Sequence, residues 1–385
     1  MTLPRETDVF IAGGGPAGLA AAIAARERGL RVLVADACHP PIEKPCGEGL
    51  MPDALAALCR LGVSIGPEAS YPFSGIRFLG GGAVSEASFP DGCGLGVRRP
   101  ALHQLLVGRA AEAGASLCWN TRVSRVCAEG VVLDNGMVRS RWIIGADGVN
   151  SRVRLWAGLD RCTHNATRFG FRRHYRVAPW SDCVEIYWGD TGQFYITPVS
   201  RQEICVVFLS RDRRQRIDDA LPKFPELQAR LRGAGATDAE RGAISVSRRF
   251  HSVVRGRVAL IGDASASVDA VTGEGLCLVF RQAWALADAL ASGELRSYEA
   301  AHTRLLKRPV LMERLMLLMD RSPWVRRRAL GALAARPAIF SSLLAAHVGS
   351  RPAPDLVMAG VLPLGWRMLT ARRIPIQGKE CRETL

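Results

Sequence analysis

Three glycines near the start of the chain have a spacing that suits close backbone contact with phosphate. Gly13, Gly15 and Gly18 form a G-x-G-x-x-G sequence, and Pro16 and Ala17 lie between the last two. In such a turn the first glycine permits a tight bend, the second lets the backbone approach a pyrophosphate, and the third lets the following helix pack on its strand. The N–H groups and the positive dipole end of that helix can then bind the phosphates.

An acidic residue and two apolar runs complete this pattern. Asp36 lies 23 residues after Gly13, where a carboxylate can accept hydrogen bonds from ribose hydroxyls. Residues 8–12 and 31–36 predict buried parallel strands, and the Ala- and Leu-rich residues 16–28 predict the helix between them. This βαβ unit predicts a dinucleotide site. A glycine turn with only a structural role is the alternative.

Two further groups of acidic and glycine residues lie far along the chain, after apolar runs that predict strands. The first is within IGADGVNSR, and the second is LIGDA followed by TGEG at the start of a predicted helix. Their residues are Asp147 and Gly148, Gly262 and Asp263, and Gly273, Glu274 and Gly275. Each acid alone is typical of a turn or a helix cap. Together, in this order, the groups indicate one site built from distant segments.

The whole pattern resembles the flavoprotein monooxygenase superfamily, which includes aromatic hydroxylases, flavin halogenases and geranylgeranyl reductases. The resemblance covers roughly residues 8–295 and implies FAD as the cofactor. It implies that Asp263 binds the ribityl chain and that Asp147 and Gly148 lie beside the pyrophosphate. It also implies that the helix opening at residues 273–275 directs its N-terminus at the isoalloxazine, where a positive dipole end stabilises an anionic reduced flavin.

The same resemblance implies roles for three more segments. Arg99, before a predicted helix over 100–113, would contact the FAD diphosphate; Arg98 is the alternative position, and a solvated surface arginine is the alternative role. Cys46 and Gly47 belong to KPCGEGL, which looks like the Cys-Gly-x-Gly-Leu stretch near the flavin of geranylgeranyl-reductase-like proteins. A buried packing role is the alternative for Cys46. Tyr195 belongs to GQFYITP, which resembles the strand lining the substrate cavity in that group.

These features predict an FAD-dependent monooxygenase that acts on a hydrophobic small molecule, either phenolic or lipid-tailed. In that reaction NAD(P)H reduces the flavin, oxygen forms a C4a-hydroperoxide, and a dry cavity protects it. No second G-x-G-x-x-G follows a predicted strand, so NAD(P)H is expected as a transient electron donor, or the electrons come from another protein. Two alternatives stay open: a geranylgeranyl-reductase-like enzyme that delivers hydride to an isoprenoid double bond, and a non-catalytic flavin-binding protein.

The sequence leaves the catalytic residue unknown and offers three candidates. His174, in the strand-like run FRRHYRV, can take a phenol proton, because imidazoles titrate near neutral pH. A hydrogen-bonded structural histidine is the alternative. Strand alternation places Arg172 on the same face as His174 and Arg173 on the other. Tyr195 and Cys46 are the other two candidates. No Cys/His cluster has zinc-ligand spacing, so no metal is expected.

The elements around these motifs predict an α/β fold: a discontinuous Rossmann-like FAD-binding domain, an inserted, mostly antiparallel β-sheet substrate domain, and a C-terminal helical region. The expected boundaries are 1–66, 97–160 and 248–300 for the first, 67–96 and 161–247 for the second, and 301–385 for the third. Asn135-Gly136 predicts a hairpin turn. Prolines 309, 323 and 337 are expected to interrupt the last helices.

Charge is concentrated in the last fifth of the chain. The net charge is +15, and from Arg304 onward there are 15 Arg and Lys against 5 Asp and Glu, a local excess of 10. Only four of the 51 basic residues are lysine, an arginine bias typical of genome composition, so no nucleic-acid partner is expected. Basic helices with Trp324 and Trp366 are typical of a peripheral anchor on anionic lipid. A helical cap with a solvated basic face is the alternative.

The spacing of the cysteines and the length of the apolar runs indicate where in the cell the protein is located. The eleven cysteines lack paired spacing, which is typical of a reducing compartment. No signal peptide precedes the first predicted strand, and no run of about 18 apolar residues predicts a spanning helix. The expected location is therefore the cytoplasm, with the basic helices at the inner face of the membrane if they form an anchor.

Overall fold

The computed structural model describes residues 4–351 and 356–370. Its first sheet has the order β18-β19-β11-β1-β2-β8. In the centre of this sheet β1 pairs in parallel with β2 and β11, and β11 pairs in parallel with β19. The strands are β1 (Glu6–Ala12), β2 (Val32–Ala35), β8 (Ser116–Cys118), β9 (Val123–Val126), β10 (Val131–Leu133), β11 (Gly136–Gly145), β18 (Val254–Arg255) and β19 (Val258–Leu260). Parallel strands of this kind are buried on both faces, which explains their continuous apolar runs.

Helices cover this sheet and share its core. The helices are α1 (Pro16–Arg26), α2 (Pro52–Arg60), α3 (Arg99–Glu112), α4 (Arg152–Trp156) and α7 (Gly275–Ser292). α1 packs against α3 and α7, with Leu19, Ile23 and Phe280 fully buried. The predicted hairpin at Asn135-Gly136 is confirmed, because β10 and β11 pair antiparallel around it.

The second sheet is almost wholly antiparallel and has the order β20-β17-β12-β15-β14-β13-β5-β6. Only β13 and β5 pair in parallel. Its strands are β5 (Gly75–Gly80), β6 (Ala83–Ser88), β12 (Cys162–Arg176), β13 (Cys183–Trp188), β14 (Gln193–Ser200), β15 (Glu203–Ser210), β16 (Gly235–Ala236), β17 (Arg241–Phe250) and β20 (Ala266–Ser267). β20 follows β19 of the first sheet in the chain and pairs with β17 of the second, so this segment ties the two sheets together.

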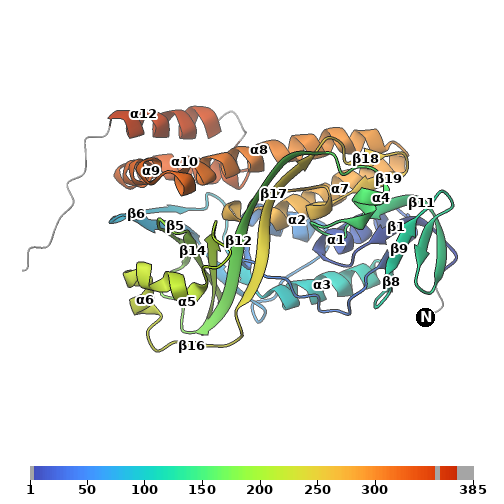
Figure 1. Cartoon of the computed structure of the whole chain (residues 1–385), viewed down its shortest axis with the longest axis horizontal. Coiled ribbons are helices and arrows are strands. Elements are labelled where there is room, and N and C mark those ends of the chain that lie inside the picture. Colours follow the sequence, from blue (N-terminus) through green and yellow to red (C-terminus); the bar gives the residue numbers. More distant parts are fainter. Residues whose placement is uncertain (1–3, 352–355, 371–385) are drawn as a thin grey trace, which may run out of the picture.

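Two smaller groups of elements flank the second sheet. A three-stranded sheet contains β3 (Gly49–Leu50), β7 (Gly94–Val97) and β4 (Ser70–Phe73) in that order. The short helices α5 (Ile217–Ala220) and α6 (Pro225–Arg230) lie next to the sheet (Figure 1) and share a buried cluster with Phe194 and Phe208 of its strands. The predicted α/β fold class with an antiparallel second sheet is confirmed.

The C-terminal helices extend along one side of the molecule, from the first sheet to the free edge of the second (Figure 1). They are α8 (Leu295–Arg321), α9 (Pro323–Ala335), α10 (Pro337–His347), the π-helical segment η4 (Leu356–Val361) and α12 (Leu362–Thr370). α9 and α10 pack on β6, and α8 packs on α7. Residues 352–355 and 371–385 of the predicted helical region lie outside the described residues.

The prediction that Pro309 interrupts these helices is wrong. Pro309 is buried inside α8, which continues to Arg321, whereas Pro323 and Pro337 begin α9 and α10. A proline at the first helical position lacks only an N–H that has no partner there, so it suits a helix start. Inside α8 the missing hydrogen bond is offset by packing, because the helix lies on α7, α9 and α10.

No single helix among the described residues is long and apolar enough to cross a bilayer. The pair α9 and α10 meets the length and composition test together, but its two members are bent by 104°.

Candidate functional site

A largely apolar cavity of about 470 Å³ lies where the parts of the fold meet. It is lined by the turn before α1, by residues 44–49 and by strands of the second sheet, among them β13, β14 and β15. It is also lined by side chains of the C-terminal helices, including Met312, Met316, Phe340 and Leu344. The cavity is therefore built by segments from the whole length of the chain.

Many of the residues singled out by the sequence line this cavity. They are Gly15, Pro16, Ala17, Cys46, Gly47, Arg99, Gly148, Tyr195, Asp263, Gly273 and Gly275. The others lie behind the wall, and they are Gly13, Gly18, Asp36, Asp147, His174, Gly262 and Glu274. Of these predicted lining residues, the two farthest apart in the sequence are Gly15 and Gly275, which are separated by 260 positions.

The glycine turn has the geometry of a phosphate cradle. Gly13 has φ +113°, and a Cβ at Gly18 would lie 1.8 Å from the carbonyl oxygen of Gly13, so both positions require glycine. At Gly15, by contrast, a Cβ would meet no atom within 4 Å. Helix α1 begins directly afterwards at Pro16 without a side-chain cap and without an acidic residue in its first turn. Its first N–H groups therefore suit an anion at the cavity wall.

Two of the predicted acids shape the loops of the site. Asp36 accepts hydrogen bonds from the backbone N–H groups of Gly14 (2.6 Å) and Cys38 (2.7 Å), so it fixes the end of β2 beside the glycine turn. Asp147 accepts hydrogen bonds from the Ser151 hydroxyl (2.5 Å) and the N–H of Arg152 (2.7 Å). These contacts match the capping alternative for Asp147, while Gly148 beside it lines the cavity.

The acids of the later motif lie on opposite sides of the cavity wall. Asp263 lines the cavity and forms an ion pair of 2.7 Å with Lys44. Glu274 does not line the cavity, and its carboxylate lies near Arg308 (3.4 Å) and His347 (3.6 Å). Burial raises the pKa of Glu274, and its electrostatic interactions with His347 and Arg308 oppose this rise only in part. Glu274 thus joins α7 to the C-terminal helices, whereas Asp263 faces the cavity.

Arg99 and its neighbour Arg98 have different surroundings. Arg98 pairs with Glu203 at 2.6 Å and lies 3.8 Å from Glu48. Arg99 lines the cavity, and its buried Nε has no hydrogen-bond partner among the described residues. A buried guanidinium nitrogen without a partner is costly unless a ligand satisfies it. Of the two positions, the structure favours Arg99 as the phosphate contact.

The three candidate catalytic side chains occupy different depths. The Sγ of Cys46 lies at the cavity wall and accepts a hydrogen bond from the Glu48 N–H at 3.4 Å. The Tyr195 hydroxyl donates to the Val271 carbonyl at 3.1 Å, and burial raises the pKa of this phenol far above its usual value. Tyr195 therefore stays neutral and cannot act as a base. His174 is fully buried on β12 and does not line the cavity.

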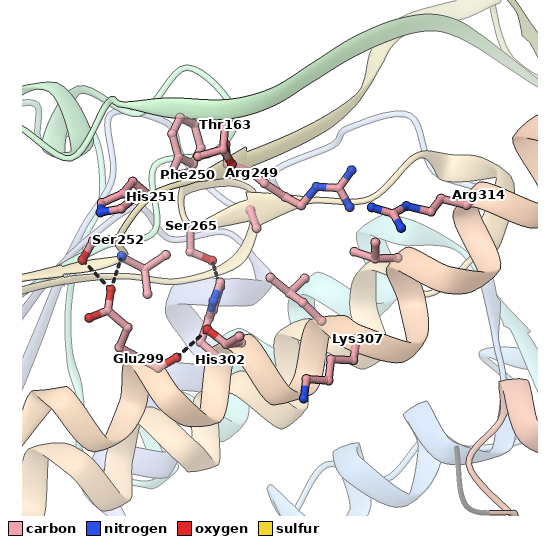
Figure 2. A pocket seen from close by; sticks show the side chains of 15 residues that line it. Thr163, Arg249, Phe250, His251, Ser252, Ser265, Glu299, His302, Lys307 and Arg314 are labelled. Atoms are coloured by element: carbon pink, nitrogen blue, oxygen red, sulfur yellow. Dashed lines mark hydrogen bonds between the residues drawn. The ribbon is translucent and has the colours of Figure 1, made fainter. Parts of the chain in front are cut away.

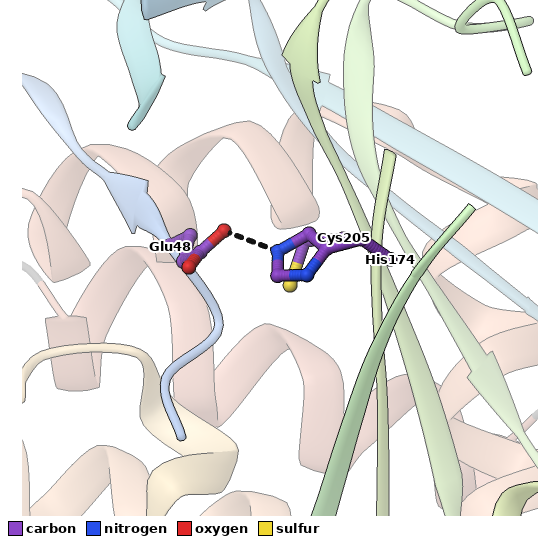
Figure 3. Close-up of side chains that lie close together, drawn as sticks. All are labelled: Glu48, His174 and Cys205. Atoms are coloured by element: carbon purple, nitrogen blue, oxygen red, sulfur yellow. Dashed lines mark hydrogen bonds and ion pairs between the residues drawn. The ribbon is translucent and has the colours of Figure 1, made fainter. Parts of the chain in front are cut away.

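His174 belongs to a buried group that also contains Glu48 and Cys205 (Figure 3). Its Nε2 lies 2.7 Å from Glu48 Oε2, and its Nδ1 lies 2.8 Å from Asp238 Oδ2. Arg172 contacts the same two carboxylates, while Arg173 pairs with Asp218 on the other side of the strand. The predicted alternation of these side chains is confirmed.

Potential ligand atoms of Glu48, His174 and Cys205 lie within 4.8 Å of one another. Both ring nitrogens of His174 already have carboxylate partners, however, and burial raises the pKa of Cys205, which keeps its thiol protonated. We therefore interpret this group as a hydrogen-bonded network. Sequence reasoning did not select Glu48 or Asp238, because their partner His174 is 126 and 64 residues away, respectively.

A second cavity of about 330 Å³ lies between β17 and α8 (Figure 2). It is lined by several polar and basic side chains, and none of the predicted site residues reaches it. On its wall the Nε2 of His302 lies 3.0 Å from the Ser265 hydroxyl. Burial lowers the pKa of His302 to about 4, so this ring is neutral at physiological pH.

The chain is similar to several known proteins. The family model described as "FAD binding domain" matches residues 6–307. A menaquinone reductase of Mycolicibacterium smegmatis is 30% identical over 331 residues, which cover 78% of this chain and 80% of that protein. The ubiquinone hydroxylase UbiL of Rhodospirillum rubrum is 28% identical over 322 residues, which cover 75% of this chain and 73% of that protein.

Two solved structures share the fold. A flavoprotein/dehydrogenase from Cytophaga hutchinsonii superimposes with a TM-score of 0.81 at 15% identity, covering 94% of this chain and 99% of that one. A geranylgeranyl bacteriochlorophyll reductase-like protein from Thermoplasma acidophilum superimposes with a TM-score of 0.70 at 21% identity, covering 92% and 96%.

Proposed function

The chain belongs to the FAD-binding-domain family, and from this premise we propose that it is an FAD-dependent reductase of a polyprenyl quinone or a closely related polyprenyl lipid. Membership of the family confirms the predicted FAD cofactor and the oxidoreductase class. The substrate class and the bond that is reduced are our proposal. They draw on the reductive alternative of the sequence analysis rather than on its first hypothesis, monooxygenation.

The observation that carries the proposal is the set of residues that line the large cavity. Residues suited to hold the dinucleotide, such as Gly15, Arg99 and Asp263, line the same cavity as Met316 and Phe340 of the C-terminal helices. A long apolar tail can therefore lie along methionine, leucine and phenylalanine side chains, with one segment beside the cofactor residues. Flexible methionines suit a chain-like ligand of variable conformation.

Different residues of the cavity bind the cofactor and exclude water in this reaction. The N-terminus of α1 and Arg99 bind the pyrophosphate of FAD, and the start of α7 at Gly275 directs its positive dipole end into the cavity. FAD, when bound, supplies a hydride that its own reduction has stored. The apolar walls exclude water, which keeps the reduced cofactor and the tail together. NAD(P)H is the electron donor that we propose.

The similar proteins support the reductive reading and also name a second candidate. One is called a menaquinone reductase and the other a ubiquinone hydroxylase. Both quinones carry polyprenyl tails, so the substrate class is common to the two names, and the higher identity belongs to the reductase. Hydroxylation of the same class of lipid by molecular oxygen is the second candidate.

A polyprenyl lipid resides in a membrane, so we also propose that the C-terminal helices contact one. Large apolar side chains are exposed there, at Leu318 (51%), Trp324 (52%), Met358 (67%) and Leu362 (55%). Apolar and basic side chains together suit the surface of an anionic bilayer. Leu364 and Met316 of the same helices line the cavity, so these helices contribute both to the exposed surface and to the cavity wall.

The test uses the FAD-loaded protein with NAD(P)H and menaquinone in detergent. In anaerobic reactions, a product that gains two hydrogens and keeps them after the ring is reoxidised with ferricyanide has a saturated tail, as the proposal expects. A gain that ferricyanide reverses places the reduction on the ring. An oxygen-dependent gain of one oxygen atom establishes the hydroxylase instead. Protein without FAD is the control.

A further inference from the structure

Three side chains form a continuous path from the protein surface to the cavity. Asp238 has a side chain that is 21% exposed, and its Oδ2 lies 2.8 Å from Nδ1 of His174. The ring of His174 is fully buried, and its Nε2 lies 2.7 Å from Oε2 of Glu48, whose side chain is also fully buried. Glu48 is a wall residue of the large cavity. Neighbouring side chains along this path are joined by hydrogen bonds. Figure 3 shows the bond between His174 and Glu48.

The geometry requires a proton that two groups share. Asp238 also accepts a hydrogen bond from the His174 backbone N–H at 2.9 Å. Burial would raise the pKa of Asp238, but the hydrogen bonds from His174 and the charge of Arg172 outweigh it and lower that pKa. Asp238 is therefore ionised, and Nδ1 of the ring donates to it. The remaining bond, between Nε2 and Glu48, holds one proton, which lies either on the ring or on the carboxyl.

The charged groups around this pair are balanced. Arg172 contacts Glu48 at 3.2 Å and Glu43 at 2.7 Å, and Arg98 lies between Glu48, Glu203 and Asp238. The thiol of Cys205 is the other titratable group in contact. Arg241 also lies 3.1 Å from Glu43. Three arginines and the shared proton thus offset the four carboxylates, so this proton can reside on either side of the Nε2–Oε2 bond without leaving an unpaired buried charge.

The backbone conformation of Glu48 and the hydrogen bonds of its carboxyl group hold that group in one place. Glu48 has φ +59°, a left-handed conformation that costs a non-glycine residue of order 1 kcal/mol. Its Oε1 accepts hydrogen bonds from the Arg99 N–H (3.0 Å) and from Arg172 (3.2 Å). Arg99 is the phosphate contact proposed above. The carboxyl is therefore fixed between the FAD-binding helix α3 and strand β12.

We propose that Asp238, His174 and Glu48 conduct protons from solvent to the reaction cavity, and that Glu48 supplies the proton that accompanies hydride transfer. This inference rests on the proposed reductase function. Reduced FAD, when bound, would supply the hydride for one carbon of the double bond, and Glu48 gives a proton to the other carbon. The π bond breaks, two C–H bonds form, and the flavin becomes oxidised. After Glu48 has given up its proton, the ring of His174 keeps only the proton on the nitrogen that faces Asp238. A half-turn of the ring brings this proton to Glu48, and the nitrogen that then faces Asp238 takes a proton from solvent through that carboxylate.

The competing explanation is that this network only ties residues 43–48 to β12. Glu43 provides a matched control for that role. It lies in the same segment and binds the same Arg172, but it lies outside the path and does not line the cavity. Glu43→Gln removes a tether and leaves the path intact, whereas Glu48→Gln keeps the size of the side chain and removes its titratable proton.

The first test needs no substrate. An infrared difference spectrum between the reduced and oxidised FAD-loaded protein should contain a carboxyl C=O band that shifts in deuterium oxide. The band should be absent in Glu48→Gln and retained in Glu43→Gln, with FAD bound by all three proteins. A spectrum that Glu48→Gln leaves unchanged overturns the proposal.

The second test uses single turnovers with menaquinone. Loss of a general acid typically slows the chemical step by about 10²- to 10⁴-fold. Glu48→Gln should show such a loss with a changed pH profile and an unchanged affinity for FAD, and Glu43→Gln should react like the wild type. Equal losses in both variants would show a tether and overturn the proposal. If the wild type saturates no double bond, the proposed function fails, and the infrared test still decides whether the proton is mobile.

Discussion

Replacing Gly15 with alanine should abolish tight FAD binding while leaving the fold intact. The backbone at this position has φ −72° and ψ 178°, which any L-residue adopts, and a Cβ there meets no protein atom within 4 Å. The unfolding free energy of Gly15→Ala should therefore stay within about 1 kcal/mol of the wild type. The added methyl group projects into the cavity at the place where the pyrophosphate has to approach α1.

The size of the effect on binding follows from the hydrogen bonds that the methyl group prevents. A hydrogen bond to a charged group contributes about 1.5–3 kcal/mol, so losing two N–H contacts costs about 3–6 kcal/mol. That range corresponds to a roughly 10²- to 10⁴-fold weaker Kd. Titration of the apoprotein with FAD, followed by flavin fluorescence, measures the affinity, and thermal unfolding of the apoprotein measures the stability.

Gly18→Ala is the control, because this substitution should lower the stability of the fold. Its Cβ would lie 1.8 Å from the Gly13 carbonyl oxygen, so β1 and α1 must separate, at a cost of about 1–3 kcal/mol or more in stability. If Gly15→Ala binds FAD as tightly as the wild type, or loses as much stability as Gly18→Ala, then the cofactor does not lie against this turn and the reasoning is refuted.

Three further predictions concern other parts of the molecule. In the folded protein the pKa of His302 is lowered to about 4, below its usual value. Between pH 6.5 and 4 the unfolded chain therefore binds more protons than the folded protein does. Stability should fall by roughly 3 kcal/mol as the pH drops through this window, and denaturant titrations should show a smaller fall in His302→Gln; parallel curves would contradict this. Met316→Trp should fill the tail end of the cavity and raise the KM for menaquinone about tenfold or more, with FAD affinity unchanged; equal KM values would argue against a tail at this wall. Trp324→Ser combined with Leu362→Ser should weaken co-sedimentation with anionic vesicles about tenfold or more, and binding that is unaffected would exclude these helices as the membrane contact.

The local part of the site could be predicted from the sequence. The glycine turn, strand, helix and Asp36 are neighbours in the chain, so their spacing specifies their geometry directly. The period of two along β12 likewise placed Arg172 and His174 together and Arg173 opposite, as the ion pairs show.

The non-local part could not be predicted. Glu48 and His174 are 126 residues apart, and nothing in either segment specifies the other. The left-handed backbone of Glu48 is also invisible in the sequence, because only glycine signals such a conformation reliably. The place of Pro309 inside α8 is not visible in the sequence either, because tertiary packing of this helix outweighs the local preference of proline.

The strand order of the first sheet also constrains how the protein is made. β1 ends at Ala12, but the last of the central parallel strands, β19, ends only at Leu260. A ribosome that adds about 5–20 residues per second needs about 12–50 s to synthesise the segment between them. In the last part of that time, after β11 has ended at Gly145, β11 lacks one neighbour, and an open strand edge can pair with other chains. Binding of FAD must therefore wait until most of the chain has left the ribosome, and expression at lower temperature with added riboflavin should increase the yield of folded protein.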